Sequence, residues 1–320
     1  MKSDRKKYRN ISIENRIELI EKLFIMHPSF ERCFNTIKEC HEHSKLSVEP
    51  LCALITGEPG VGKTTLCEKY EKMYPRVELE EKTKVPVLVA RIPVPATPKN
   101  MVTALLSALG DPLADKGTTY SKTLRLFNLL RQCQVEIIII DEFHHVIDGD
   151  SDKVLYTVSD WLKQLINEAK LPIILVGLPH SIKILEANPQ LKRRFAMREE
   201  LSNFKWVKGK GSKRDDNHEE TDTDEETAST PETESDNDFK AFLKILDETL
   251  PLADNSHLAG APIAYRIWKA TSGNVNRTMK LVRYAAKSAL KSSEEKVTNE
   301  LLKRAYERIF SEDSSKNPFV

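Results

Sequence analysis

A glycine-rich loop near residue 60 carries the residue types that bind phosphate. It follows an apolar run at residues 51–55 and precedes a helical pattern, and this context fits the GxxxxGK[ST] phosphate-binding motif. The glycines let the backbone curl so that successive N–H groups point inward, and the following helix adds the positive end of its dipole. The loop consists of Gly57, Glu58, Pro59, Gly60, Val61, Gly62, Lys63, Thr64 and Thr65.

Two side chains of this loop predict how a nucleoside triphosphate is held. Lys63 would reach the β- and γ-phosphates, and the hydroxyl of Thr64 would bind Mg²⁺. The alternative is a chance glycine-rich turn, which the flanking strand and helix patterns argue against. The sequence therefore predicts a site for ATP and Mg²⁺.

A pair of acidic residues ends the most apolar stretch of the chain. Four isoleucines at residues 137–140 precede Asp141 and Glu142, which predicts a rigid central strand with two carboxylates at its tip. Asp141 would hold Mg²⁺ through water, and Glu142 would orient and polarise a water for in-line attack on the γ-phosphate. A strand ending in two acids is weak evidence alone, but downstream of a phosphate loop it predicts ATP hydrolysis.

The elements that must position these residues alternate along the chain. Apolar runs that predict strands lie at residues 51–55, 85–94, 135–140, 172–177 and 197–201. Amphipathic patterns between them predict helices, with Thr97 placed to cap one of these. Nearly all-apolar strands favour an α/β fold, in which helices cover both faces of a parallel sheet. Ligands of such sheets bind at the carboxyl ends of the strands, where the phosphate loop and Asp141-Glu142 both fall.

The chain is expected to fall into five segments. They are an N-terminal helical extension (1–45), a nucleotide-binding core (46–207), a disordered acidic insert (208–238), a helical lid (239–312) and a tail (313–320). The extension reads as two amphipathic helices, the first capped by Ser12. His41 and His43 stand among charged residues at its end, where we expect them at the surface.

The composition indicates a soluble protein of a reducing compartment. The five cysteines form no CxxC pair and lie mostly in apolar patterns, which argues against a disulfide framework or a zinc site. No apolar run is long enough to cross a bilayer, and no apolar signal segment follows the basic start. We therefore expect a cytoplasmic protein.

The net charge of +1 hides an uneven distribution. Of the 48 acidic residues, twelve lie between Asp215 and Asp238 without any Lys or Arg, so 36 face 49 basic residues elsewhere. The acidic segment lacks apolar periodicity, and we expect either a solvated linker or a mimic of nucleic acid that competes for a basic face. The basic remainder is consistent with a nucleic-acid partner.

Five stretches together resemble the AAA+ ATPases and, more narrowly, the TniB/TnsC group of ATPases that regulate DNA transposition. They are GEPGVGKTTL, IIIIDEFHHV, PIILVGLP, LKRRF and LPLADNSHLAGAPIAYRIWKATSGNVNRTMKLVRYAAKSAL. The resemblance runs from about residue 30 to residue 309 apart from the acidic segment, and the last stretch is the most specific. It implies an AAA+ P-loop sheet followed by a small helical lid, with adenosine held between them and each site completed by a neighbouring subunit.

The resemblance also implies roles for three arginines. LKRRF matches the arginine-finger segment, with Arg194 the better match and Arg193 the second; a guanidinium there would stabilise charge on the next subunit's γ-phosphate. The alternative is a basic helix end favoured by the helix dipole. Arg277 matches the lid arginine called sensor 2, with a salt-bridged surface residue as the alternative. At the sensor 1 position the chain departs from the family pattern and leaves only His180 or Ser181 as substitutes.

The group binds DNA along a helical filament of subunits, which points to four residues here. By matching, Lys99 and Thr118 would contact the DNA backbone, with Lys116 beside Thr118 and Arg125 further along the same face. A cation and a hydroxyl near a helix start suit phosphates, which position a protein without reading sequence. The alternative is that these are ordinary solvated side chains.

The leading hypothesis is an ATP-dependent, DNA-binding regulator of transposition. It would oligomerise on duplex DNA as a filament or ring, mark the target, and recruit a transposase and a target-selection protein of the TniQ type. ATP hydrolysis would then dismantle the assembly. Two alternatives stay open: a replication-type AAA+ loader or initiator, and a nucleotide-gated switch that binds only protein. The replication class predicts a winged-helix domain after the lid, and we expect the residues after Phe310 to be too few for one.

Overall fold

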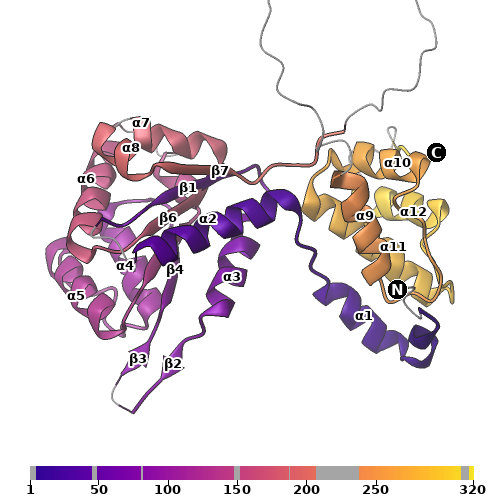
Figure 1. The fold of residues 1–320 in the computed structure, drawn as a ribbon, viewed down its shortest axis with the longest axis horizontal. Helices are drawn as coiled ribbons and strands as arrows, with labels where there is room; N and C mark the ends of the chain where they lie inside the picture. The colour runs from indigo at the N-terminus through magenta and orange to yellow at the C-terminus, as the bar shows by residue number, and fades with distance from the viewer. Residues whose placement is uncertain are drawn as a thin grey trace, which may run out of the picture. The chain divides into compact units, whose positions relative to one another are not determined.

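The computed structural model of the 320-residue chain describes residues 5–44, 49–80, 82–147, 152–186, 188–206, 238–310 and 317–320. The chain forms two compact units (Figure 1). We call Pro28–Ser202 the sheet unit, and Met1–His27 together with Asn203–Val320 the helical unit. Most of the predicted acidic insert, residues 208–237, lies outside the described residues.

A five-stranded parallel sheet forms the centre of the sheet unit, as the apolar runs predict. Its strands stand in the order β4 (Val87–Arg91), β5 (Ile137–Asp141), β6 (Ile173–Gly177), β1 (Ala53–Thr56) and β7 (Met197–Glu200). β5 and β6 are buried along their whole length, because each lies inside the sheet with a strand on either side. Their nearly all-apolar sequences, in which Asp141 at the end of β5 is the one charged residue, suit strands that have no face in water.

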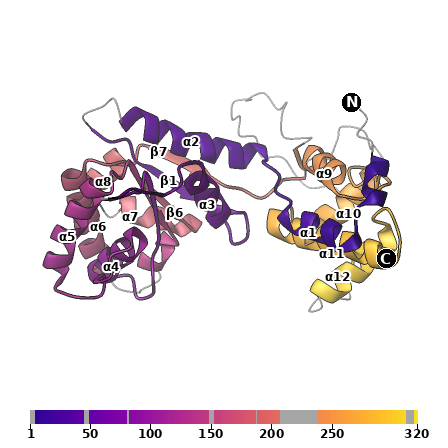
Figure 2. The ribbon, with the colours of Figure 1, turned by 90° about the horizontal axis from the view of Figure 1, so that it is seen from below.

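Helices flank this sheet. α2 packs on β1, β7 and α3, whereas α4 packs on β4 and α5 (Figure 2). The helices of this unit are α2 (Pro28–Ser44), α3 (Lys63–Met73), α4 (Pro98–Leu109), α5 (Thr119–Gln132), α6 (Asp152–Ala169), α7 (Lys183–Glu186) and α8 (Pro189–Arg194). Two short 3-10 helices follow β5 and β6, namely η2 (Phe143–Val146) and η3 (Pro179–Ile182). The apolar sides of α4, α5 and α6 form one core with β4, β5 and β6.

Local sequence fixes the ends of α4. The hydroxyl of Thr97 accepts a hydrogen bond from the Asn100 N–H at 3.3 Å, so the predicted cap is confirmed. Pro98 takes the first helical position, where its missing N–H costs nothing. Gly110 ends the helix with a φ of 91°, a conformation that glycine adopts without strain. Ser12 caps α1 in the same way, through the N–H of Asn15.

The helical unit joins the N-terminus to the C-terminal helices. Its helices are η1 (Arg5–Asn10), α1 (Ile13–Lys22), α9 (Asp238–Thr249), α10 (Ala261–Thr271), α11 (Val275–Lys291) and α12 (Asn299–Ile309). Arg16 on α1 donates to the carbonyl of Pro251 at 2.7 Å and to the carboxylate of Glu295 at 3.0 Å. The expected extension of residues 1–45 is thus divided: α1 belongs to the helical unit, whereas α2 packs on the sheet.

Two local expectations for the sheet unit need correction. The strand expected at residues 85–94 covers only Val87–Arg91, and a two-stranded hairpin of β2 (Val77–Glu78) and β3 (Thr83–Lys84) precedes it. His41 is buried, not at the surface, because its ring nitrogens lie 2.9 Å from the Tyr70 hydroxyl and 3.1 Å from Glu136. Distant side chains decide its burial, so the charged residues beside it in sequence gave the wrong signal.

The described end of the chain packs on the helical unit. Phe319 is buried beside Tyr306, and its carbonyl accepts a hydrogen bond from Asn299 at 2.9 Å. Asp238, assigned in the sequence analysis to the acidic insert, is the first residue of α9. Among the described helices, none combines the length and the apolar character that spanning a bilayer requires.

We predict that Arg16→Ala destabilises the helical unit far more than Arg9→Ala. Arg16 is 3% exposed and bonds a carbonyl and a carboxylate, so its loss should lower the free energy of unfolding by about 2–4 kcal/mol. The side chain of Arg9 is 56% exposed and pairs with an equally exposed Asp254, so its loss should cost under about 1 kcal/mol. Urea unfolding followed by circular dichroism measures both, and equal losses would contradict the role given to Arg16.

The ion pair of Arg16 and Glu295 also makes stability depend on pH. The hydrogen bond from Arg16 holds the pKa of Glu295 below its ordinary value. A lowered pKa stabilises the fold above the ordinary pKa of Glu, and the gain is lost as pH falls through the lowered value. The acid-side loss of stability should therefore be smaller in Arg16→Ala than in the parent.

Candidate nucleotide-binding site

The phosphate loop lies between β1 and α3, as predicted, and its positions require glycine for different physical reasons. Gly60 and Gly62 have φ values of 78° and 105°, and Gly62 is the residue from which α3 begins. A Cβ on Gly57 would stand 2.4 Å from the carbonyl oxygen of Leu201, so no side chain fits there. The N–H of Gly57 donates to the carbonyl of Gly177 at 3.1 Å, which ties the loop to the end of β6.

Lys63 is folded back onto its own loop. Its Nζ donates to the carbonyls of Gly57 at 2.7 Å and Glu58 at 3.0 Å, and the residue is 8% exposed. Burial lowers the pKa of Lys63, whereas the charges of Glu142, Asp141 and Glu58 act in the opposite direction. The ammonium group is thus held by two carbonyl dipoles of the loop. A charged acceptor such as a phosphate oxygen would form a stronger hydrogen bond and could replace them.

A hydrogen bond connects the loop to the tip of β5. Oγ1 of Thr64 donates to Oδ2 of Asp141 at 2.8 Å, and Oδ1 of Asp141 accepts from the N–H of Glu142 at 2.8 Å. Asp141 is 1% exposed, and Nε of Arg91 lies 3.8 Å from its Oδ2. A hydroxyl and a carboxylate oxygen side by side form a donor set that suits Mg²⁺, which prefers oxygen ligands. Thr64 and Asp141 could therefore hold this ion, as the sequence predicts.

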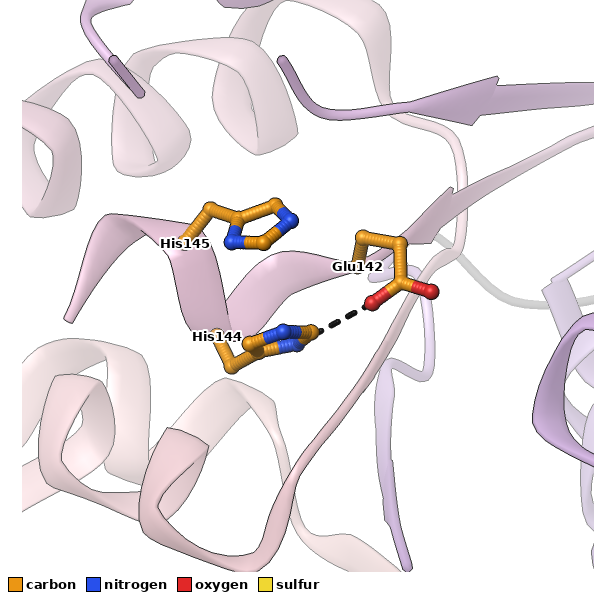
Figure 3. Close-up of side chains that lie close together, drawn as sticks. All are labelled: Glu142, His144 and His145. Carbon is orange, nitrogen blue, oxygen red and sulfur yellow. Dashed lines mark ion pairs between the residues drawn. The ribbon is translucent and has the colours of Figure 1, made fainter. Parts of the chain in front are cut away.

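Glu142 has a different backbone conformation from Asp141, which is the last residue of β5. Its φ of 58° places it in the left-handed region, where it precedes η2. Its side chain is half-buried, and Oε2 lies 3.3 Å from Nδ1 of His144 (Figure 3). The ring of His145 lies 4.3 Å from that of His144, centroid to centroid. No role is expected for these two histidines from the sequence, although they directly follow Asp141-Glu142-Phe143.

The end of β6 holds the two candidates for the sensor 1 position. The ring of His180 meets that of His144 edge-on, with centroids 5.9 Å apart. Ser181 is fully buried against Gly177, where a Cβ on the glycine would stand 2.3 Å from its Oγ. His180 is therefore the candidate whose side chain contacts the residues after β5.

The three matched arginines occupy different surroundings. Arg194 ends α8 and donates to Oδ1 of Asn167 at 2.6 Å, whereas Arg193 beside it is exposed. Arg277 lies on α11 of the helical unit, with its guanidinium 4.5 Å from the ring centroid of Phe310. The finger and sensor roles of these arginines stay predictions.

The four residues predicted to contact DNA lie on and between α4 and α5. Lys99 is exposed in the first turn of α4, and Lys116 is exposed beside Asp115, which it contacts at 3.1 Å. Thr118 is the N-cap of α5, where its hydroxyl accepts a hydrogen bond from Ser121 N–H. These three side chains stand at the surface, where phosphates could reach them.

Arg125 has a structural task in the same loop. Its Nε donates to Oδ2 of Asp111 at 2.6 Å, and its terminal nitrogen donates to the carbonyls of Leu113 at 2.6 Å and Lys116 at 3.3 Å. These contacts fix the backbone between α4 and α5 and place Lys116 in front of α5. A DNA contact through Arg125 stays a prediction that competes with these bonds.

Comparison with known proteins supports the same fold. A family model described as "Bacterial TniB protein" matches residues 16–206, more than half of the chain. An ORC1-type DNA replication protein of Methanosphaera stadtmanae is 26% identical over 118 residues, which span 35% of this chain and only 31% of that protein.

Two solved structures of Aeropyrum pernix proteins are similar over most of the chain. The ORC2 protein in ADPNP–ADP complexes is 13% identical with a TM-score of 0.57, covering 91% of this chain and 70% of its own. The ORC1 protein in complex with DNA is 18% identical with a TM-score of 0.55, covering 92% and 69%. At these identities the likeness concerns the fold, and it confirms the predicted AAA+ arrangement of a parallel sheet followed by a helical part.

We predict that Arg125→Ala loosens the loop at residues 111–118 in the absence of DNA. Losing its charge-assisted bonds should cost about 1–3 kcal/mol of local stability and speed amide exchange through the loop. Hydrogen-exchange mass spectrometry measures this, with Arg131→Ala as a control because Arg131 is exposed on the same helix. Unchanged exchange in Arg125→Ala would show that the loop does not depend on this guanidinium.

Proposed function

This chain belongs to the bacterial TniB family and has an AAA+ fold, and on that premise we propose that it is an ATP-dependent, DNA-binding regulator of transposition. The observation that supports the ATP-dependent part of the proposal is the bond between Thr64 and Asp141 beside the buried Lys63, and family membership supports the role in transposition. It brings a hydroxyl, a carboxylate and an ammonium group together at the carboxyl ends of the strands. Those three groups are what a magnesium–triphosphate complex requires.

Each residue of the site would have a separate task in ATP hydrolysis. Lys63 would exchange its carbonyl acceptors in the loop for the β- and γ-phosphate oxygens, which are the stronger acceptors. Thr64 and Asp141 would hold Mg²⁺, which when bound neutralises charge on the phosphates. Glu142 would accept a hydrogen bond from the attacking water and orient it, once its carboxylate turns from His144.

A neighbouring copy of the chain would complete the site. Arg193 and Arg194 end α8, and a guanidinium from this segment would stabilise charge on the γ-phosphate of the next subunit. Arg193 is the exposed member of the pair, whereas Arg194 would first have to leave Asn167. Bound ATP would in this way promote a filament or ring of subunits, and hydrolysis would weaken it.

Duplex DNA is the proposed binding partner on which the subunits assemble. Lys99, Lys116 and Thr118 are exposed near the starts of α4 and α5, which suits contacts to phosphates without reading of bases. The likeness to a DNA-bound ORC1 structure supports this reading. On DNA in the bacterial cytoplasm, the assembly would mark a target and recruit a transposase and a TniQ-type target-selection protein.

A replication initiator or loader is the second candidate, because two of the similar solved structures and one relative in sequence are ORC proteins. Both functions need ATP and DNA, so neither nucleotide binding nor DNA binding separates them. Stimulation of a transposase by the ATP-bound protein would favour the first function, whereas loading of a replicative helicase would favour the second.

We predict that two variants separate ATP binding from ATP hydrolysis. Lys63→Ala should lose ATP-dependent assembly on duplex DNA, because the phosphates lose their charged partner. Glu142→Gln should still bind ATP and accumulate long assemblies, while its kcat falls by about 100-fold or more because the general base is gone. Phosphate release and electron microscopy measure the two effects, with Lys72→Ala as a control because Lys72 is exposed on the same helix. Assembly of Lys63→Ala equal to that of the parent would refute the proposal.

We predict that Lys99→Ala and Lys116→Ala each weaken DNA binding equally for all sequences. The slope of log K against log salt is negative, and each substitution should make it less steep by about 1, because one phosphate contact is lost. Fluorescence anisotropy with ATP analogue at several salt concentrations measures the slope, and Lys38→Ala on α2 is the control. Slopes that do not change would move the DNA surface elsewhere.

A further inference from the structure

We propose that Glu142, His144 and His145 bind a transition-metal ion of the Zn²⁺ class, and that the bound ion withdraws Glu142 from ATP hydrolysis. One ligand atom from each of the three side chains lies within 4.8 Å of the others. The carboxylate of Glu142 and the ring of His144 face one another, and the ring of His145 lies above that of His144 in the view (Figure 3).

The spacing of the donors fits a tetrahedral ion. Ligand atoms about 2.1 Å from Zn²⁺ at tetrahedral angles stand about 3.4 Å apart. Oε2 of Glu142 and Nδ1 of His144 are already 3.3 Å apart. The His145 nitrogen lies within 4.8 Å of both atoms and would have to approach them by up to about 1.4 Å, and the fourth position would be left for water.

The donor chemistry distinguishes this site from the magnesium site beside it. Imidazole nitrogens suit Zn²⁺ and its neighbours in the first transition row, whereas Mg²⁺ prefers oxygen. Thr64 and Asp141 offer only oxygen atoms and bond each other. Glu142, His144 and His145 together offer one carboxylate and two imidazoles. The two sites would therefore take different ions from the same solution.

The backbone holds the donors in place. The left-handed conformation of Glu142 begins a tight turn, in which the N–H of His145 donates to the Glu142 carbonyl at 3.1 Å. The N–H of Ile147 donates to the His144 carbonyl at 2.7 Å and closes the next turn. His144 is 8% exposed, whereas Glu142 and His145 are partly exposed. An ion can therefore reach the site from solvent, and the buried ring of His144 is already held in one orientation.

The consequence for hydrolysis rests on the proposed ATPase function. A carboxylate bound to a metal ion is a poor acceptor for the proton of water, and its position is fixed toward the histidines. ATP can still bind, because Lys63, Thr64 and Asp141 are not ligands of the ion. The metal-bound protein would therefore keep its nucleotide and hold its assembly on DNA.

Zn²⁺ binding by the full chain, without a histidine tag and without nucleotide, tests the site. Isothermal titration should show one ion per chain, and Co²⁺ should give the visible absorption of a tetrahedral site that Zn²⁺ abolishes. His145→Ala is the main variant because this side chain is half-exposed; it and Glu142→Gln should bind more than about tenfold more weakly. Exposed His43→Ala is the control for a lost histidine, and Thr64→Val, which removes the magnesium hydroxyl, should bind Zn²⁺ like the parent. Parent-like affinity in His145→Ala, or no binding by the parent, overturns the proposal.

A second measurement tests the effect on hydrolysis. With Mg²⁺ in excess, Zn²⁺ at saturating concentration should lower ATP turnover by about tenfold or more in the parent and not in His145→Ala. A filter-binding measurement should show that ATP stays bound in both. Unchanged turnover in the Zn²⁺-bound parent overturns the regulatory step. Absence of any turnover without Zn²⁺ overturns the proposed function instead, and the titration decides the metal site independently.

Discussion

The buried carboxylate of Asp141 constrains the whole nucleotide site. A charged oxygen that water cannot reach must be met by donors, and here the first turn of α3 and the N–H of the next residue supply them. The donors come from segments that are far apart in sequence, so the loop after β1 and the tip of β5 must meet before the charge is satisfied. This requirement fixes where α3 crosses the sheet and therefore where a phosphate group would stand.

The sequence indicates this part of the molecule well because its signals are local. Four consecutive isoleucines, all β-branched, favour a strand without an exposed face, and the glycines of the loop are required by their backbone angles and by the approach of Leu201. The AAA+ fold and the TniB family, both expected from the sequence, are confirmed by the comparisons. Helix caps at Ser12 and Thr97 are also local, and both are found where their patterns place them.

Features that depend on distant partners could not be found in this way. His41 is buried because Tyr70 and Glu136 reach it, and neither lies near it in the chain. Arg125 is expected from the sequence to add to a DNA-contacting face because it lies shortly beyond Thr118, yet in the structure its guanidinium holds the loop between two helices. The grouping of Glu142 with His144 and His145 depends on a left-handed turn, which a pattern of residue types does not reveal.

The composition of the helical unit has a consequence for how the chain folds as it is made. The sheet unit is one continuous piece, Pro28–Ser202, and it can fold as soon as it leaves the ribosome. The helical unit is assembled from both sides of that piece, and Arg16 finds its partners only at Pro251 and Glu295. α1 is made before the sheet unit but can pack only after residues 251 and 295 have been made, and until then its apolar side must be kept from other newly made chains.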